Sequence, residues 1–281
     1  MVNNKKFETV IFHHIPKTAG TTFYSIIETQ LPKSEIYTIN GNQLEHEKSL
    51  EKFKNLTKSD LANIKILKGH NVYGLDQFFA QDCTYFAIIR KPEQRFVSSY
   101  YSMLRGKQEL PERIDFIANR VPLDEYIRRG DLYFGHNSLC KIIINCRDKN
   151  FEITREYFNS IKESLTKNFS LIGLTESFDE TVVLANRTFN WNIKFYQRKN
   201  EAQNYIKEEL DPEYYKLYKK MNPFDVELYE FIEALFKKKI EEYGSGFLKD
   251  LSLLKRLNRR KNAKIALVNS VKKKLKFLLG R

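Results

Sequence analysis

The chain has 281 residues, of which 42% are apolar and 14% aromatic, so it can build a packed core and is not expected to be disordered. Its net charge of +13 is concentrated at one end, because residues 255–281 carry eleven basic and no acidic side chains. No run approaches the roughly 18 apolar residues of a membrane span, and the start of the chain lacks the apolar stretch of a secretory signal. We therefore expect a soluble globular protein, either complete or a trimmed catalytic domain.

Three cysteines, Cys83, Cys140 and Cys146, are odd in number and form no C-x-x-C pair. This usage fits reduced buried thiols better than a disulfide framework. It predicts a cytoplasmic location.

The first informative stretch is residues 10–23, which read V-I-F-H-H-I-P-K-T-A-G-T-T-F. A β-branched and aromatic run, a short turn and an apolar helix-like segment predict strand, loop and helix. A loop that leads into a helix N-terminus favours an anion, and a lysine and two threonine hydroxyls add to that preference. We predict a phosphate or sulfate cradle formed by Lys17, Thr18, Ala19, Gly20, Thr21 and Thr22. An ordinary strand-to-helix turn is the alternative for a motif of this length.

The position of the lysine distinguishes two kinds of phosphate loop. A P-loop nucleotide hydrolase has lysine directly after the last glycine, whereas Lys17 precedes Gly20 by three positions. The motif P-K-T-A-G-T-T instead resembles the 5′-phosphosulfate loop of sulfotransferases that use 3′-phosphoadenosine-5′-phosphosulfate (PAPS). Within them it resembles the carbohydrate branch of heparan sulfate and uronyl 2-O-sulfotransferases, in sulfotransferase family 2.

The polar residues 31–60 predict a loop with at most a surface helix, and a half-buried strand follows over Ile64 to His70. Ligands of open α/β sheets collect beyond the carboxyl ends of the strands, so His70 is expected near the cradle. The segment G-H-N-V-Y-G resembles the G-H-V segment of the 2-O-sulfotransferases, which implies that His70 is the catalytic base. A structural hydrogen bond is the alternative for a lone histidine. The family often has a second histidine two positions earlier, where this chain has Lys68.

The most apolar short run, Thr84 to Arg90, predicts a central buried strand. Its continuation R-K-P-E-Q-R-F-V-S-S-Y-Y resembles the 3′-phosphate motif of sulfotransferases, usually R-D-P-x-x-R-x-x-S-x-Y. The resemblance implies that Arg90 and Ser98 bind the 3′-phosphate of PAPS, with Arg95 and Tyr100 as supports. An arginine fork matches phosphate oxygens well. Lys91 stands where the family has aspartate.

The middle of the chain, residues 110–150, shows helical periodicity. In the family this region shapes the acceptor cleft, which implies that four of its polar side chains could contact a sugar: Arg128, Arg129, His136 and Asn137. The alternative for each of them is a position on a solvent-exposed helix face.

Two further strands are predicted, over residues 170–176 and 193–198. Glu176, at the end of the first, is a second carboxylate candidate near the site, and we expect it to hold a basic residue instead. Ser177 is expected to cap the next helix, with Glu180 three residues on. A late basic loop covers the 3′-phosphate or adenine in sulfotransferases, which implies that role for Arg198 and Lys199.

We predict a long helix over Asn222 to Tyr243, with a proline in its first turn. The resemblance to the sulfotransferases extends from Glu8 to Gly244. The rest of the chain mixes leucines with basic residues and predicts a basic amphipathic helix. It could contact an anionic membrane at the inner face or pack on the body. No pattern for nucleic-acid binding accompanies it.

Together these features predict an α/β, P-loop-like, three-layer fold with a central, mostly parallel sheet, in a sulfotransferase domain over residues 1–245 and a helical basic tail over 246–281. The predicted activity is metal-independent transfer of a sulfuryl group from PAPS to a hydroxyl of a glycan or glycolipid. In this prediction Lys17 stabilises the leaving group and His70 is the base. The alternatives are a P-loop-type kinase or nucleotide hydrolase, and a non-catalytic anion- or membrane-binding protein on the same scaffold.

Overall fold

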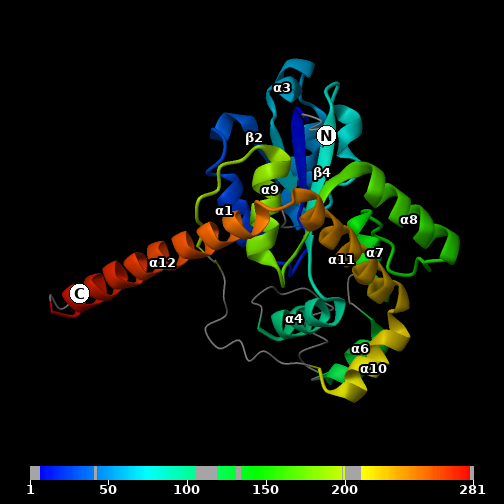
Figure 1. Ribbon diagram of the computed structural model, residues 1–281. Coiled ribbons are helices and arrows are strands. Elements are labelled where there is room, and N and C mark those ends of the chain that lie inside the picture. The colour runs from blue at the N-terminus through cyan, green and yellow to red at the C-terminus, as the bar shows by residue number, and fades with distance from the viewer. Residues whose placement is uncertain are drawn as a thin grey trace.

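The computed structural model describes residues 7–40, 43–105, 119, 121–130, 134–197, 199 and 210–278 (Figure 1). Its centre is a five-stranded sheet in the order β2-β3-β1-β4-β5. Every pair of neighbouring strands in this sheet is parallel. The strands are β1 (Thr9–His13), β2 (Ile36–Ile39), β3 (Ile66–Gly69), β4 (Cys83–Ile89) and β5 (Phe169–Leu174). The predicted α/β fold around a parallel sheet is confirmed.

Helices join the strands and cover both faces of the sheet (Figure 1). The helices of the described residues are α1 (Gly20–Ile27), α2 (Gln43–Lys54), α3 (Lys58–Asn63), α4 (Pro92–Arg105), α6 (Leu123–Arg129), α7 (Ser138–Ile143), α8 (Arg155–Asn168), α9 (Phe178–Phe189), α10 (Pro212–Met221), α11 (Pro223–Tyr243) and α12 (Phe247–Leu278). Two 3-10 turns, η1 (Lys33–Glu35) and η2 (Leu75–Phe78), complete the list.

The three layers follow from the alternation of side chains along β1, which points successive residues to opposite faces. Phe12 packs on Phe23 of α1, with ring centroids 5.3 Å apart. Its neighbour His13 points the other way, and its Nε2 lies 3.0 Å from the carbonyl oxygen of Ile142 in α7. The continuous apolar strands that the sequence shows are therefore buried on both sides, as parallel strands usually are.

A smaller hydrophobic cluster lies apart from the sheet, where α4, α6 and α10 pack together (Figure 1). Its buried members are Phe96, Tyr100, Met103, Val121, Tyr126, Ile127 and Tyr218. The helix that leads from this cluster back to the sheet is α11, which begins at the predicted residue and packs against β5.

The capping of α11 joins it to α7. The side-chain oxygen of Asn137 accepts the backbone N–H groups of Phe224 and Asp225, at 3.0 and 3.2 Å. In return, the carboxylate of Asp225 accepts the N–H groups of Leu139 and Cys140, both at 2.9 Å. Each helix therefore satisfies the free N–H groups of the other, and the pair fixes the region next to the C-terminal edge of the sheet.

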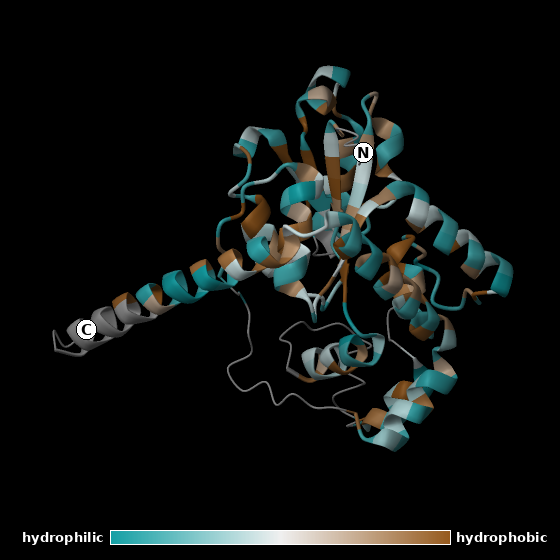
Figure 2. Cartoon of the chain, viewed as in Figure 1, coloured by the Kyte–Doolittle hydropathy of each residue, from teal (hydrophilic) through white to brown (hydrophobic). Residues whose placement is uncertain are grey.

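The C-terminal helix α12 has two parts. Phe247, Leu251 and Leu254 are buried in the same hydrophobic core as the sheet. Beyond them Asn258 and Lys261 still contact residues 195–196, and past these contacts the helix extends away from the body (Figure 1). Figure 2 shows mainly hydrophilic residues where this part of the helix is coloured. The division of the chain after residue 245 stays a prediction, but the first turns of α12 pack as part of the main core.

Three local predictions were wrong. The polar stretch 31–60 contains the strand β2, and residues 193–197 belong to no strand. Ser177 is the N-cap residue of α9, yet its side chain makes no capping hydrogen bond. Instead, Glu180 forms an ion pair with Lys255 of α12 at 3.0 Å.

Candidate active site

The carboxyl end of β1 is flanked on one side by the end of β3 and on the other by the end of β4. His13, the last residue of β1, pairs with Gly69 of β3 and with Ala87 of β4. The cradle that starts after His13, His70 after β3 and Arg90 after β4 therefore leave the sheet at one edge. This edge is where ligands of open parallel sheets bind. The sequence predicted this convergence, and the strand order confirms it.

The cradle between β1 and α1 holds its backbone in an unusual conformation. Lys17 and Ala19 have φ angles of 69° and 63°, in the left-handed region that residues with a side chain rarely adopt. Thr18 between them is buried, and its hydroxyl donates to the carbonyl oxygen of Ile15 at 2.8 Å. The first turn of α1 contains no acidic residue that would neutralise the positive end of the helix dipole. Strained loops of this kind cluster at ligand sites, and this one ends at a helix N-terminus suited to an anion.

The two threonines of the cradle differ. Thr21 is exposed, whereas Thr22 is buried. The hydroxyl of Thr22 accepts the backbone N–H of Lys199 at 3.0 Å and donates to its carbonyl oxygen at 3.3 Å. Thr22 therefore connects the cradle to a segment 177 residues later in the chain, a role that its spacing in the sequence did not indicate.

The predicted base, His70, stacks on a second histidine. Its ring lies 4.1 Å from that of His14, at an interplanar angle of 29°. His14 in turn covers Gly20 so closely that a Cβ atom there would lie 1.8 Å from the imidazole Nε2. The Nδ1 atom of His14 is buried without a hydrogen-bond partner among the described residues. His14 thus lies between the cradle and His70, and the sequence prediction missed it.

Burial keeps these histidines neutral. It lowers the pKa of His70 below its ordinary 6.5, with a hydrogen bond from the imidazole to the backbone of His14 acting in the opposite direction. Burial and the neighbouring His70 lower the pKa of His14 as well. A neutral imidazole can accept a proton, so the environment of His70 suits a general base. His13 is also buried, with a pKa lowered to about 4, but it faces α7 on the other side of the sheet.

Behind His14 lies a column of side chains that ends in an ion pair. The ring of Tyr24 meets that of His14 edge to face at 4.8 Å, and the Nζ atom of Lys68 lies 4.5 Å from the Tyr24 centroid. Lys68 is almost completely buried and pairs with Glu28 at 2.5 Å. The residue that replaces the second family histidine therefore supports the histidine stack from behind.

On the other side of the cradle, Arg90 and Ser98 are both half-buried, and the Nε of Arg90 donates to Gln94 of α4 at 3.4 Å. Arg95 is fully buried and donates to the hydroxyl of Ser138. The hydroxyl of Tyr100 donates to the carbonyl oxygen of Val121 at 3.0 Å. The two residues implied as supports thus hold α4 in place, which leaves Arg90 and Ser98 as the candidates for contact with a phosphate.

The turn after β4 is held from the end of β5. One carboxylate oxygen of Glu176 accepts the backbone N–H of Lys91 at 2.8 Å, and the other accepts the hydroxyl of Tyr229 at 3.3 Å. Glu176 therefore anchors the position at which the family has aspartate. It binds the backbone there, rather than the basic side chain that the sequence suggested.

The other predicted candidates take structural positions or lie outside the described part. His136 contacts the carbonyl oxygen of Ile127 through Nε2 at 3.3 Å, and Arg129 pairs with Glu125 on α6. Lys199 is exposed, and Arg198 lies outside the described residues.

The described residues contain neither a membrane-spanning helix nor a cluster of metal ligands. None of their helices has the length and apolar content to cross a bilayer, and no three of their His, Cys, Asp or Glu residues group as metal ligands would. Metal independence stays a prediction.

Three comparisons relate this chain to known proteins. A family model described as Galactose-3-O-sulfotransferase matches residues 3–275, so the match runs beyond Gly244 and along most of α12. The chain is 25% identical over 178 residues to Galactose-3-O-sulfotransferase 3 of Mus musculus, covering 60% of this chain and 41% of that protein. It is 24% identical over 194 residues to the Galactosylceramide sulfotransferase of Bos taurus, covering 64% and 44%. The chain thus spans less than half the length of these relatives.

Among solved structures, the mouse sulfotransferase SULT7A1 complexed with PAP is similar, with a TM-score of 0.39 and 13% identity over 78% of this chain and 66% of that one. That likeness is too loose to carry an argument about the site. The motifs resembled the 2-O-sulfotransferases most, whereas the matching family model describes a galactose-3-O specificity. The 2-O subtype is therefore not confirmed.

Proposed function

The chain belongs to the galactose-3-O-sulfotransferase family, and from that premise we propose that it transfers a sulfuryl group from PAPS to a hydroxyl of a galactose-containing glycan or glycolipid. The names of the two relatives, which refer to galactose and to galactosylceramide, support this acceptor class. One observation carries the proposal. The strained cradle, a half-buried histidine and an arginine leave adjacent parallel strands at one edge of the sheet.

The residues at this edge suit the two ends of the donor. The cradle and the N-terminus of α1 would hold the 5′-phosphosulfate, and Lys17 would add a positive charge. Arg90 and Ser98 would hold the 3′-phosphate, where the arginine fork can donate two parallel hydrogen bonds. PAPS supplies the sulfuryl group and a phosphate leaving group.

In the proposed reaction the acceptor hydroxyl oxygen forms a bond to sulfur as the bond between sulfur and the phosphate oxygen breaks. His70 takes the hydroxyl proton, which requires the neutral ring that its burial favours. Lys17 and the first turn of α1 stabilise the negative charge that develops on the leaving phosphate. His14 lies between these two groups and keeps the ring of His70 in place.

Calorimetric titration with the product nucleotide adenosine 3′,5′-bisphosphate (PAP) tests the donor assignment. We expect the wild type to bind and Arg90→Ala to bind at least tenfold more weakly, because a charge-assisted contact to phosphate is lost. Arg129→Ala is the matched control, since this exposed arginine pairs with Glu125 on α6. A wild type that fails to bind PAP but hydrolyses ATP with magnesium would identify a nucleotide hydrolase instead.

The acceptor requires a separate screen. The purified protein is incubated with labelled PAPS and galactose-terminated oligosaccharides, galactosylceramide or a uronic acid polysaccharide. Label transfer to the first two supports the proposal. Transfer to the polysaccharide alone would restore the 2-O specificity that the sequence motifs suggested.

The distal part of α12 supports a second contact. In the sequence, residues 255–281 carry eleven basic and no acidic side chains, and we propose that this segment binds anionic lipid. Each basic residue near such a surface contributes about 1 kcal/mol, and salt screens the attraction. Co-sedimentation with phosphatidylserine vesicles at low salt, lost at high salt and absent with neutral vesicles, is the expected result. Equal binding to neutral vesicles would contradict it.

A further inference from the structure

A segment that crosses the molecule between α9 and the cradle, residues 191–197 and 199, is here called the strap. Its residues belong to no helix and to no strand. Apart from the N–H of Trp191, which donates to the carbonyl oxygen of Asn186 at 3.0 Å, the backbone hydrogen bonds described here go to side chains. Ile193 exchanges two with Asn186, through its N–H at 2.9 Å and its carbonyl oxygen at 3.0 Å. The N–H of Asn192 donates to Gln30 at 3.0 Å. Side chains from other elements therefore determine where the strap lies.

The far end of the strap rests on the cradle. Both polar backbone atoms of Lys199 bond to the hydroxyl of Thr22, in the first turn of α1. Lys199 also lies close enough to α1 to affect Glu28, whose pKa is lowered first by Lys68 and further by Lys199. Any shift of the strap is therefore transmitted to the residues that begin at Gly20.

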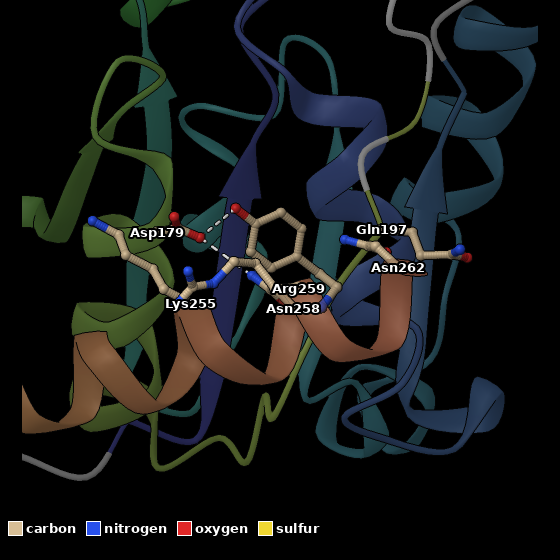
Figure 3. A pocket seen from close by; sticks show the side chains of 7 residues that line it. Asp179, Gln197, Lys255, Asn258, Arg259 and Asn262 are labelled. Atoms are coloured by element: carbon tan, nitrogen blue, oxygen red, sulfur yellow. Dashed lines mark hydrogen bonds between the residues drawn. The ribbon is translucent and has the colours of Figure 1, made fainter. Parts of the chain in front are cut away.

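The middle of the strap is held by α12. The side-chain oxygen of Asn258 accepts the N–H of Tyr196 at 2.9 Å, and its amide donates to Asp179 at 3.3 Å. The hydroxyl of Tyr196 donates to the same oxygen of Asp179 at 2.7 Å. Figure 3 shows these groups meeting at the wall of a groove of about 730 Å³ between the strap and α12. Asn258 thus ties the C-terminal helix to the strap across this groove.

We propose that α12 is a positioning element of the donor site, and that Asn258 is its positioning residue. It acts on the nucleotide through the strap and Thr22 and does not touch the donor. The inference rests on the proposed function, because it assigns the strap to the binding of a phosphosulfate nucleotide. The buried Phe247, Leu251 and Leu254 fix the helix on the core, so Asn258 presents its amide from a rigid support.

The test is PAP titration of Asn258→Ala in the full chain. We expect a dissociation constant about tenfold higher, the factor that corresponds to one hydrogen bond of ordinary strength. In turnover assays KM for PAPS rises by a similar factor while kcat changes less, because the acceptor and His70 are untouched. Asn262→Ala is the matched control, since this exposed residue lines the same groove one turn later and is expected to bind PAP like the wild type.

Two further variants separate positioning from a general loss of structure. Tyr196→Phe removes only the hydroxyl bonded to Asp179 and is expected to weaken PAP binding in the same direction. Thr22→Val removes the hydroxyl that binds the other end of the strap. If Asn258 acts through Thr22, the double variant with Asn258→Ala is expected to bind PAP no more weakly than whichever single variant binds it less tightly. Thermal melting of each variant shows that binding is measured on folded protein.

The outcomes are distinct. A wild type that does not bind PAP overturns the proposed function. A wild type that binds, together with an Asn258→Ala variant that binds equally well, overturns the positioning role alone. Additive losses in the double variant would also overturn it, because they would show that Asn258 and Thr22 act separately.

Discussion

Gly20 is the residue of the cradle that lies against His14 of the histidine stack, and Gly20→Ala tests whether that contact serves catalysis. The backbone tolerates alanine, because Gly20 begins α1 and its φ is not in the left-handed region. The space does not. The new Cβ would lie 1.8 Å from Nε2 and 2.0 Å from Cδ2 of His14, against a normal contact of about 3.5 Å. The imidazole must therefore retreat by roughly 1.5 Å, which breaks its stack on His70.

Stability and activity are expected to respond differently to this change. Alanine improves helix propensity by about 1 kcal/mol over glycine, while loss of the stack costs about 0.5–1.5 kcal/mol. These terms nearly cancel, so the melting temperature is expected to stay within about 4 °C of the wild type. Turnover is expected to fall by about 100-fold, the effect of misplacing a reacting group by about 1 Å.

The assay is sulfate transfer from labelled PAPS, run beside thermal melting. Gly246→Ala is the matched control, because its Cβ would meet only Tyr243, at an ordinary 3.7 Å. The double variant Gly20→Ala with His14→Ala removes the clash and is expected to be no less active than His14→Ala alone. If Gly20→Ala folds normally and keeps wild-type turnover, the stack of His14 on His70 has no part in the reaction.

Three further predictions concern buried and paired charges. Asp225→Asn is expected to lower the free energy of unfolding by about 3 kcal/mol, because the fully buried carboxylate binds two N–H groups of α7 and lies near a buried arginine. Urea titration measures this, and an unchanged unfolding midpoint would contradict it. Glu28 has a lowered pKa in the folded state, mainly through Lys68, so its contribution to stability is present above pH 4.5 and is lost as the pH falls through its folded value. Glu28→Gln is therefore expected to flatten the acid side of a stability profile, and a parallel shift of the whole profile would refute that reasoning. Burial lowers the pKa of His70, and His46 adds to that effect. In the pH profile of kcat/KM, the fall in activity toward acid pH is therefore expected to have its midpoint below pH 6.5. A midpoint above pH 6.5 would exclude this histidine as the base.

The cradle was predictable because its signals are local. A β-branched run, a short turn with lysine and glycine, and an apolar segment in helical spacing lie within residues 10–23. Hydrophobic periodicity and helix-start signals depend on a few neighbouring residues, so they can be recognised in the sequence before the packing partners of the segment are known. The same reasoning placed Arg90 at the end of a buried strand and His70 at the end of another, and the parallel sheet brought both to the cradle.

β2 shows where such local signals fail. Its four residues, Ile36–Ile39, lie in a polar stretch and are too few to show a clear alternation. They form a strand because β3 offers them a parallel partner at the edge of the sheet. Strand formation there depends on a neighbour about thirty residues away, which periodicity within the segment does not reveal.

By itself the sequence determined the strand-loop-helix unit over residues 10–23 and the residues that follow two of the buried strands, because these follow from spacing within short segments. Only the tertiary structure decided that His14 rather than His13 faces the site, that Glu176 binds a backbone N–H, and that Asn258 holds the strap. Each of these is a contact between residues more than 50 positions apart. The residue type states what a side chain can bond to, but the packing of the helices on the sheet selects the partner.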